Sequence, residues 1–233
     1  MPPEGFRVRY RTLEFDDVDI HVRTLRDFQE FFDAGSKAAA SGIYDGTWSH
    51  FGVIWDSSIV LARLMLDFEI EGKRILEVGC GIALSSLVLN HRSADISATD
   101  HHLEAEGFLD LNVELNDGDK IPFFLTAWED PERAELGTFD LIIGSDLLYE
   151  QGHAEKLSSF IDQHAAASCE VVLVDPGRGY HARFSKKMVA LGFSHRQHKP
   201  KDMGDLKKPF PGQVLRYHRQ GSGSEAGVAE SPG

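Results

Sequence analysis

Cysteine is scarce in this sequence of 233 residues: there are two, Cys80 and Cys169, and neither lies in a Cys-x-x-Cys or Cys-x-x-His spacing. This scarcity excludes a disulfide scaffold and a zinc ribbon, and it fits a reducing compartment. A chain of this length, with 42% hydrophobic residues, can bury a full core without covalent support. We therefore predict one globular domain of ordinary size.

Long apolar runs and an excess of basic residues are also lacking. No segment approaches the roughly 18 apolar residues needed to cross a membrane, and residues 1–10 lack the apolar core of a secretory peptide. The 37 acidic residues outnumber the 24 basic ones, and the resulting net charge of −13 repels nucleic acids. The densest basic stretch, residues 186–208, is interrupted by Asp202 and Asp205. We expect a cytoplasmic monomer that binds neither membranes nor nucleic acids.

What the sequence does contain is an alternation of short apolar runs with longer amphipathic stretches, which is typical of an α/β domain. Brief apolar runs predict strands buried on both faces, at residues 74–78, 94–99, 122–126, 140–145 and 170–175. Helical spacing predicts helices at residues 57–68, 83–91, 103–115, 154–167 and 181–191, the first capped by Ser57 or Ser58. Two last strands, at 192–198 and 213–219, have no long helix between them. We therefore predict a mostly parallel sheet with helices on both faces and an antiparallel pair added at the C-terminal end.

The two ends of the chain differ from this pattern. Residues 1–45 form an N-terminal arm, with a short strand predicted at 19–22 and a helix around 24–33, and we expect it to pack over the ligand edge of the sheet. Residues 220–233 contain almost nothing to bury and predict a disordered tail. The central segment, residues 46–219, is the expected functional domain.

The most informative stretch is ILEVGCGIALSS, residues 75–86, in which a strand leads through a Gly-x-Gly turn into a helix. Gly79 and Gly81 allow a ligand to approach the backbone closely. Asp100 follows about twenty residues later at the end of the next strand, where a carboxylate can accept hydrogen bonds from both ribose hydroxyls. The alternative is an ordinary tight turn, with Asp100 capping the following helix.

The identity of the ligand depends on what this turn lacks. The dinucleotide fingerprint requires Gly or Ala three residues after the second glycine, and this chain has Leu84 there. Glu77 is unfavourable beside a pyrophosphate but acceptable beside a cation. A sulfonium methyl donor carries positive charges and no phosphate, so Glu77, Gly79 and Gly81 favour S-adenosylmethionine over NAD.

Four ordered blocks, LEVGCG, ATD, TAW and FDLIIGSDLLYE, resemble the seven-strand class I methyltransferases. More narrowly, the chain is similar to methyltransferase family 16, the non-SET protein-lysine methyltransferases. Residues 53–65 match the Trp-containing helix of that family, and residues 146–149 (DLLY) match its Asp-x-x-Tyr signature. VLVDPGRG, residues 172–179, is similar to the branch that modifies the β subunit of electron-transfer flavoprotein. The resemblance implies a Rossmann-like seven-stranded sheet.

The resemblance also implies which residues contact the cofactor. In addition to Glu77, which the charge argument selects, these are Trp55, Gly79, Cys80, Gly81, Asp100, Trp128 and Ser145. For the two tryptophans the alternative is core packing, since Trp is usually at least partly buried. Cys80 is expected to contribute its backbone rather than act as a nucleophile, because no His or Lys partner is apparent.

Asp146 and Tyr149 are the predicted catalytic residues. Methyl transfer to an amine is an in-line displacement that requires alignment, and a lysine ammonium must first lose its proton. At the carboxyl end of a strand, Asp146 is placed to hold and orient the amine. Tyr149 supplies a hydroxyl and a ring face against a methylammonium. The alternative is that Asp146 caps the next helix and Tyr149 only packs.

Two further groups are ambiguous from the sequence. Asp175-Pro176-Gly177-Arg178 follows the fifth strand and either shapes the acceptor pocket or forms a Pro-Gly turn with a salt bridge. The His101-His102 pair and the other histidines lack the spacing of a metal site, so no metal is expected.

The sequence and the resemblance together predict an S-adenosylmethionine-dependent N-methyltransferase acting on a lysine of a protein substrate. One alternative is a methyltransferase for a small amine, such as a nicotinamide-like pyridine. Another is a catalytically silent cofactor-binding subunit, which an intact Asp146 and Tyr149 argue against. An NAD-linked oxidoreductase is disfavoured by Leu84.

Overall fold

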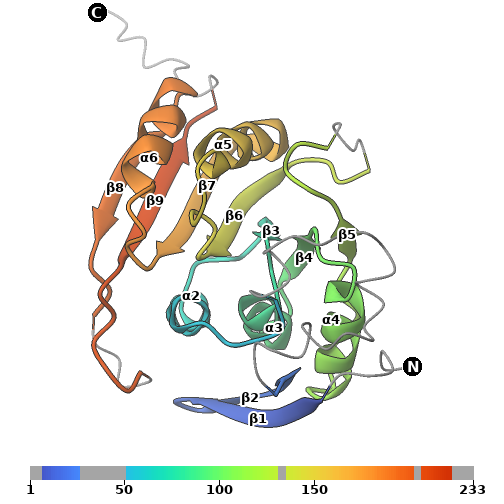
Figure 1. Ribbon diagram of the computed structural model, residues 1–233. Coiled ribbons are helices and arrows are strands. Elements are labelled where there is room, and N and C mark those ends of the chain that lie inside the picture. Colours follow the sequence, from blue (N-terminus) through green and yellow to red (C-terminus); the bar gives the residue numbers. More distant parts are fainter. Residues whose placement is uncertain (1–6, 27–50, 131–134, 202–205, 222–233) are drawn as a thin grey trace, which may run out of the picture.

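The computed structural model describes residues 7–26, 51–130, 135–201 and 206–221. Its centre is a sheet of seven strands: β3 (Arg74–Val78), β4 (Asp95–Asp100), β5 (Phe123–Leu125), β6 (Phe139–Ser145), β7 (Ala165–Asp175), β8 (Ser194–His198) and β9 (Gln213–Arg219). They lie in the order β5-β4-β3-β6-β7-β9-β8 (Figure 1). The strands predicted at 74–78 and 213–219 have the observed bounds, and the bounds of the others differ by one to five residues at one or both ends.

The directions of the strands explain where a ligand can bind. β9 runs antiparallel to both β7 and β8, and the other neighbouring strands are parallel. The prediction of a mostly parallel sheet with an antiparallel C-terminal strand is therefore confirmed. After β3 the chain adds β4 and β5 on one side and then crosses to add β6 and β7 on the other. Such a reversal opens a crevice at the carboxyl ends of the two central strands, here β3 and β6.

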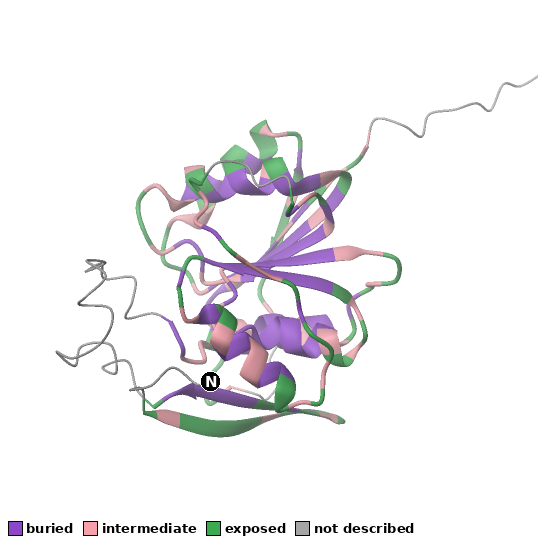
Figure 2. Cartoon of the chain, turned by 90° about the vertical axis from the view of Figure 1, so that its right-hand side faces the viewer, coloured by how far each residue is buried: buried purple, intermediate pink, exposed green. Residues whose placement is uncertain are grey.

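Helices cover both faces of the sheet, as predicted (Figure 1). On one face lie α2 (Asp56–Leu66), α3 (Leu84–His91) and α4 (Ala105–Glu114), and on the other α5 (His153–His164) and α6 (His181–Ala190). Alternating side chains of one strand serve the two layers: Ile75 packs with α2 and α3, whereas Leu76 packs with α5 and α6. The central strands are consequently buried along nearly their whole length (Figure 2).

The described part of the N-terminal arm is an antiparallel hairpin of β1 (Val8–Phe15) and β2 (Val18–Leu25). It lies below the helices α2, α3 and α4, on the side away from the sheet (Figure 1). Phe15, Ile20 and Val22 are buried there in one cluster with α2 and α3. The main-chain N–H of Arg23 donates to Oδ1 of Asn112 on α4 at 2.7 Å. The hairpin therefore extends the helical layer and does not cover the ligand edge of the sheet.

This placement corrects part of the expectation for the arm. The strand predicted at 19–22 is part of the longer β2, and Thr24 and Leu25, predicted to begin a helix, end that strand. The rest of the predicted helix, together with residues 34–45, lies outside the described residues, as do residues 222–233 of the predicted tail.

A second correction concerns the end of α5. The helix predicted to reach residue 167 stops at His164, and β7 begins at Ala165. Ala165 pairs with Phe139 of β6, and its carbonyl accepts a hydrogen bond from the Arg219 guanidinium at 3.0 Å. Sheet pairing therefore overrides the helix propensity of three consecutive alanines. Among the described residues, no helix has the length and apolar character needed to cross a bilayer.

Candidate active site

A cavity of about 320 Å³ lies at the carboxyl ends of β3, β4 and β6, where the strand order reverses. This volume falls in the range of small-molecule sites. All the predicted site residues except Glu77 line the cavity, namely Trp55, Gly79, Cys80, Gly81, Asp100, Trp128, Ser145, Asp146 and Tyr149. They come from five separate segments of the chain, which the fold brings to a single edge of the sheet.

The glycine turn after β3 forms one wall of the cavity. Gly79 and Gly81 have φ angles of 60° and 56°, in the left-handed region that favours glycine. A Cβ on Gly79 would lie 2.6 Å from Cδ2 of Leu147, whereas a Cβ on Gly81 would meet no protein atom within 4 Å. Gly81 therefore leaves space at the cavity wall, and this space is what a ligand needs to approach the backbone.

Asp100, at the end of β4, fixes this turn. Its Oδ2 accepts a hydrogen bond from the N–H of Gly81 at 2.8 Å, and its Oδ1 accepts one from the N–H of His102 at 2.8 Å. It does not cap α4, whose N-cap residue is Glu104. Oδ1 also lies 3.5 Å from Nδ1 of His101. Each carboxylate oxygen has two lone pairs, so Oδ2 can still accept a hydrogen bond from a ribose hydroxyl.

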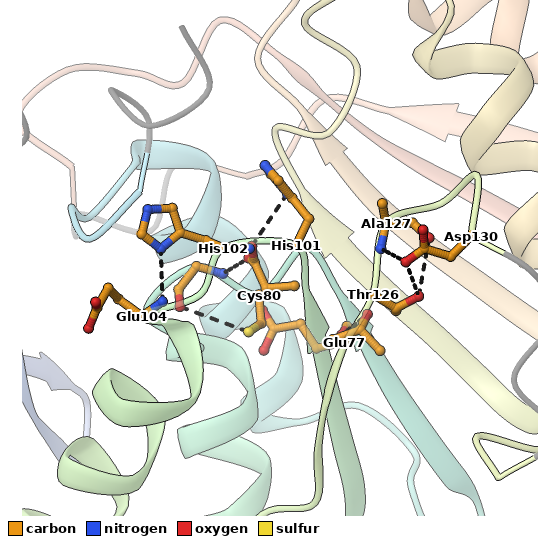
Figure 3. A network of polar contacts seen from close by, with 11 residues as sticks. Glu77, Cys80, His101, His102, Glu104, Thr126, Ala127 and Asp130 are labelled. Carbon is orange, nitrogen blue, oxygen red and sulfur yellow. Dashed lines mark hydrogen bonds and ion pairs between the residues drawn. The ribbon is translucent and has the colours of Figure 1, made fainter. Parts of the chain in front are cut away.

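Glu77 is the predicted cofactor residue that the structure does not bring to the cavity. Its Oε2 accepts hydrogen bonds from the N–H and the hydroxyl of Ser86 on α3, at 2.8 and 2.5 Å. Burial raises the pKa of Glu77 to about 7. Figure 3 shows Glu77 near Cys80, where β3 ends. Its position supports the glycine turn through α3, and direct contact with the cofactor remains a prediction.

Cys80 lies between the two glycines and is buried. Its N–H donates to the carbonyl of Thr99 at 2.9 Å, which ties the turn to β4. Burial raises the pKa of the Cys80 thiol, so the thiol is protonated at neutral pH. These contacts agree with the expectation that Cys80 contributes its backbone and is not a nucleophile.

Trp55 stands just before α2 and lines the cavity. It is the N-cap residue of that helix, and no side chain caps the helix there. The predicted cap, Ser57 or Ser58, is therefore wrong: the hydroxyl of Ser58 instead donates to the carbonyl of Trp55 at 2.7 Å. The tryptophan is held at the cavity by this local bond.

His153 connects the remaining aromatic residues. Its ring meets Trp128 edge-on, with centroids 5.1 Å apart, and Tyr149 edge-on at 4.5 Å. Nδ1 of His153 lies 2.9 Å from the carbonyl oxygen of Leu147. His153 was not predicted from the sequence, because a histidine at the first position of a helix has no spacing that distinguishes it.

Asp146 follows β6 in an unusual backbone conformation, with φ at 54°. Its carboxylate accepts two hydrogen bonds from Arg178, one from Nε at 2.6 Å and one from Nη2 at 2.7 Å. Asp146 does not cap α5, whose N-cap residue is Gly152. The salt-bridge reading of the Asp175–Arg178 turn is therefore confirmed. Arg178 lines the cavity as well, and a role of the turn in the acceptor pocket stays a prediction.

The charges around the cavity suit a cation. The lining contains four carboxylates and two basic side chains: Asp100, Glu129, Asp146 and Glu150 against Lys156 and Arg178. Lys156 pairs with Glu129 at 2.6 Å and Arg178 pairs with Asp146, which leaves an excess of negative charge. Such a lining favours a sulfonium compound over a pyrophosphate. In the part of the chain that the structure describes, no group of three His, Cys, Asp or Glu is arranged to hold a metal.

The sheet order and this cavity define the class of the protein: it has the fold of a class I methyltransferase. A 16S rRNA methyltransferase of T. thermophilus, solved with S-adenosylmethionine and guanosine, superimposes with a TM-score of 0.62 over 94% of this chain and 52% of its own, at 15% identity. At that identity the likeness shows the fold alone. The chain belongs to the lysine methyltransferase family, whose family model matches residues 44–188. The predictions of fold and family are thus confirmed.

Named relatives agree with this membership. The chain is 30% identical over 141 residues to the protein N-lysine methyltransferase METTL21A of Danio rerio, covering 54% of this chain and 62% of the relative. It is 26% identical to the electron transfer flavoprotein beta subunit lysine methyltransferase of Rattus norvegicus, covering 55% and 51%. It is also 26% identical to the histidine protein methyltransferase 1 homolog of Dictyostelium discoideum, over 60% of this chain and 45% of the relative. The chain thus matches about half the length of these relatives.

Proposed function

We propose that this protein transfers a methyl group from S-adenosylmethionine to the side-chain amine of a lysine in a protein substrate. The observation that carries the proposal is that Asp146 and Tyr149 line the same cavity as the glycine turn and Asp100. Membership of the lysine methyltransferase family supports the reaction. The names of the relatives support a protein as the acceptor.

The residues present fit the cofactor. The space beside Gly81 and the remaining lone pair on Oδ2 of Asp100 suit the methionine and ribose portions, and the excess of carboxylates suits the positive charges. When bound, S-adenosylmethionine supplies a methyl carbon on a sulfonium, which an amine lone pair attacks in line while the C–S electron pair stays on sulfur. Trp55, Trp128 and Ser145 complete the proposed contacts.

Asp146 and Tyr149 are the proposed catalytic residues. Asp146 accepts a hydrogen bond from the acceptor amine and directs its lone pair along the line of attack. Burial and nearby carboxylates raise the pKa of Tyr149 to about 12, so its hydroxyl is a proton donor and not a phenolate at neutral pH. The ring of Tyr149 offers a face to the methylammonium product.

The setting of the reaction is part of the same proposal. Both cysteines are free and buried, which supports a reducing compartment such as the cytoplasm. We propose that the enzyme acts there as a monomer that recognises its protein partner with this one domain, 46–219, and with residues of the arm, 1–45.

The test is a search for methyl acceptors in a cell lysate. The purified protein and its Asp146→Asn variant are each incubated with tritiated S-adenosylmethionine and a dialysed lysate, and with the small-molecule fraction alone. The proposal predicts label in precipitable protein with the wild type and not with the variant. Label in the small molecules alone supports a small-amine methyltransferase. Cofactor binding without any transfer supports a silent subunit.

A further inference from the structure

Arg178 lies in the loop between β7 and α6 and contacts the carboxylate that is proposed to hold the acceptor. Both of its hydrogen bonds to Asp146 are short, at 2.6 and 2.7 Å, and each carboxylate oxygen receives one. These bonds raise the pKa of Arg178, which therefore stays charged. The side chain of Asp146 is only 9% exposed, whereas that of Arg178 is 37% exposed. A nearly buried carboxylate thus has a permanent cation as its partner.

The geometry leaves Asp146 able to bind a second group. A carboxylate offers about four lone-pair positions, and the paired contact with Arg178 uses two of them. The guanidinium also lies 5.8 Å from the centre of the Trp55 ring. Asp146 can therefore accept an N–H hydrogen bond from a ligand while its negative charge is already balanced.

The other ionisable groups around this ion pair come from several elements and are mostly acidic. They are Asp100 at the end of β4, Tyr149 and Glu150 after β6, Asp175 at the end of β7, His153 of α5 and His181 of α6. Oδ1 of Asp175 lies 3.6 Å from Nδ1 of His181. Burial raises the pKa of Asp175. Without Arg178, this surrounding charge would favour a positively charged acceptor.

We propose that Arg178 is a positioning residue that neutralises Asp146, so that the acceptor reacts in the site as an uncharged amine. The inference rests on the proposed function. An ammonium has no lone pair for the attack, so the acceptor must first release its proton to water. An unpaired carboxylate stabilises the ammonium, whereas a neutral ion pair accepts an N–H bond without retaining the proton. The nitrogen lone pair then forms the N–C bond, and the C–S electron pair remains on sulfur.

The experiment compares pH profiles of Arg178→Gln, which removes the charge, and Arg178→Lys, which keeps it. Arg183→Gln is a matched control, because Arg183 pairs with Glu155 at 2.7 Å outside the cavity. Melting temperatures first establish that all the variants fold. The acceptor protein labelled in the lysate is purified, and kcat is measured at saturating acceptor between pH 6 and pH 10, together with kcat/KM.

The inference predicts that the acid limb of kcat moves up by about one pH unit or more in Arg178→Gln. At pH 7 this is about a tenfold loss, and it is recovered at high pH. The acid limb of kcat keeps its wild-type position in Arg178→Lys and Arg183→Gln. The acid limb of kcat/KM reports the free enzyme and the free acceptor. It does not move, because the free lysine, with an ordinary pKa near 10.4, limits it in every variant. An even loss of kcat at every pH contradicts this inference, and so does a lower KM with an unmoved acid limb of kcat. Neither result contradicts the proposed function. If the wild type labels no protein while still binding S-adenosylmethionine, the proposed function fails and the inference falls with it.

Discussion

The main-chain N–H of Gly81 donates to Oδ2 of Asp100 at 2.8 Å, so the carboxylate proposed to bind a ribose also holds the turn proposed to contact the cofactor. The other oxygen of Asp100 accepts a hydrogen bond from the N–H of His102. One side chain therefore links the ends of β3 and β4 and remains a hydrogen-bond acceptor at the cavity. Variants of Asp100 have to separate these two roles.

Asp100→Asn keeps an oxygen for one of these N–H groups but replaces the other oxygen and removes the charge. We expect S-adenosylmethionine and S-adenosylhomocysteine to bind about 10- to 100-fold more weakly, because hydrogen bonds to charged groups are worth about 1.5–3 kcal/mol. Asp100→Ala loses both acceptors, so it should weaken binding further and also lower the melting temperature. Calorimetric titration and thermal unfolding measure the two effects. Unchanged affinity in Asp100→Asn contradicts the ribose assignment.

Gly81→Ala tests whether the space at the turn belongs to the cofactor. A Cβ there meets no protein atom within 4 Å, and φ is 56°. We expect a loss of about 1 kcal/mol in the free energy of unfolding from backbone strain, but loss of S-adenosylmethionine binding because the methyl group occupies the ligand's space. Gly72→Ala is the matched control, with φ at 67°, an equally open Cβ position and a place outside the cavity. Equal cofactor affinity in the two variants argues against a ligand at Gly81.

Asp146→Asn separates cofactor binding from transfer. The cofactor contacts proposed for the glycine turn and Asp100 do not involve Asp146, so affinity for S-adenosylmethionine should stay within a few-fold of the wild type. Transfer should fall by about 100-fold or more, as expected when the group that aligns the acceptor amine for in-line attack is lost. The checks are calorimetry and the initial rate of labelling. Full activity shows that another residue aligns the acceptor.

Glu77→Gln tests the buried carboxyl beneath the turn. The folded-state pKa of Glu77, about 7, lies above the ordinary value of 4.5, so the folded state binds this proton more tightly than the unfolded state. The contribution of Glu77 to the free energy of unfolding is therefore fully present below about pH 4.5 and is lost as the pH rises through about 7. It amounts to about 3 kcal/mol. Urea unfolding at pH 5 and pH 8 should show that the free energy of unfolding falls more between these two pH values in the wild type than in Glu77→Gln. Parallel losses in the two proteins would contradict this assignment.

The cavity was predictable because its residues follow parallel strands. Gly79, Asp100 and Asp146 each come at or just after the carboxyl end of a short apolar run, and such ends meet at one edge of a sheet. The contact of Glu77 with the cofactor stays a prediction, because Glu77 does not line the cavity. Side chains alternate along a strand, so Glu77 shares the face of Ile75, toward α3, and the alternation of β3 indicated this orientation.

Two features could not be obtained in this way. The hairpin β1–β2 buries Phe15 and Ile20 against helices that come much later in the chain, and no local pattern states which surface will receive them. Asp146 and Arg178 are separated by 32 residues. A Pro-Gly turn fixes the neighbourhood of Arg178 but not its partner, so the ion pair depends on the packed ends of β6 and β7.

The central claim is that the methyl group reaches the nitrogen of a lysine in a protein. The most direct measurement is amino-acid analysis of the labelled lysate protein after acid hydrolysis, with mass spectrometry of the modified peptide. The account predicts that the tritium elutes with Nε-methylated lysine, and that the label is lost with Asp146→Asn. Label that elutes with methylated histidine, or that stays in the small-molecule fraction, contradicts it.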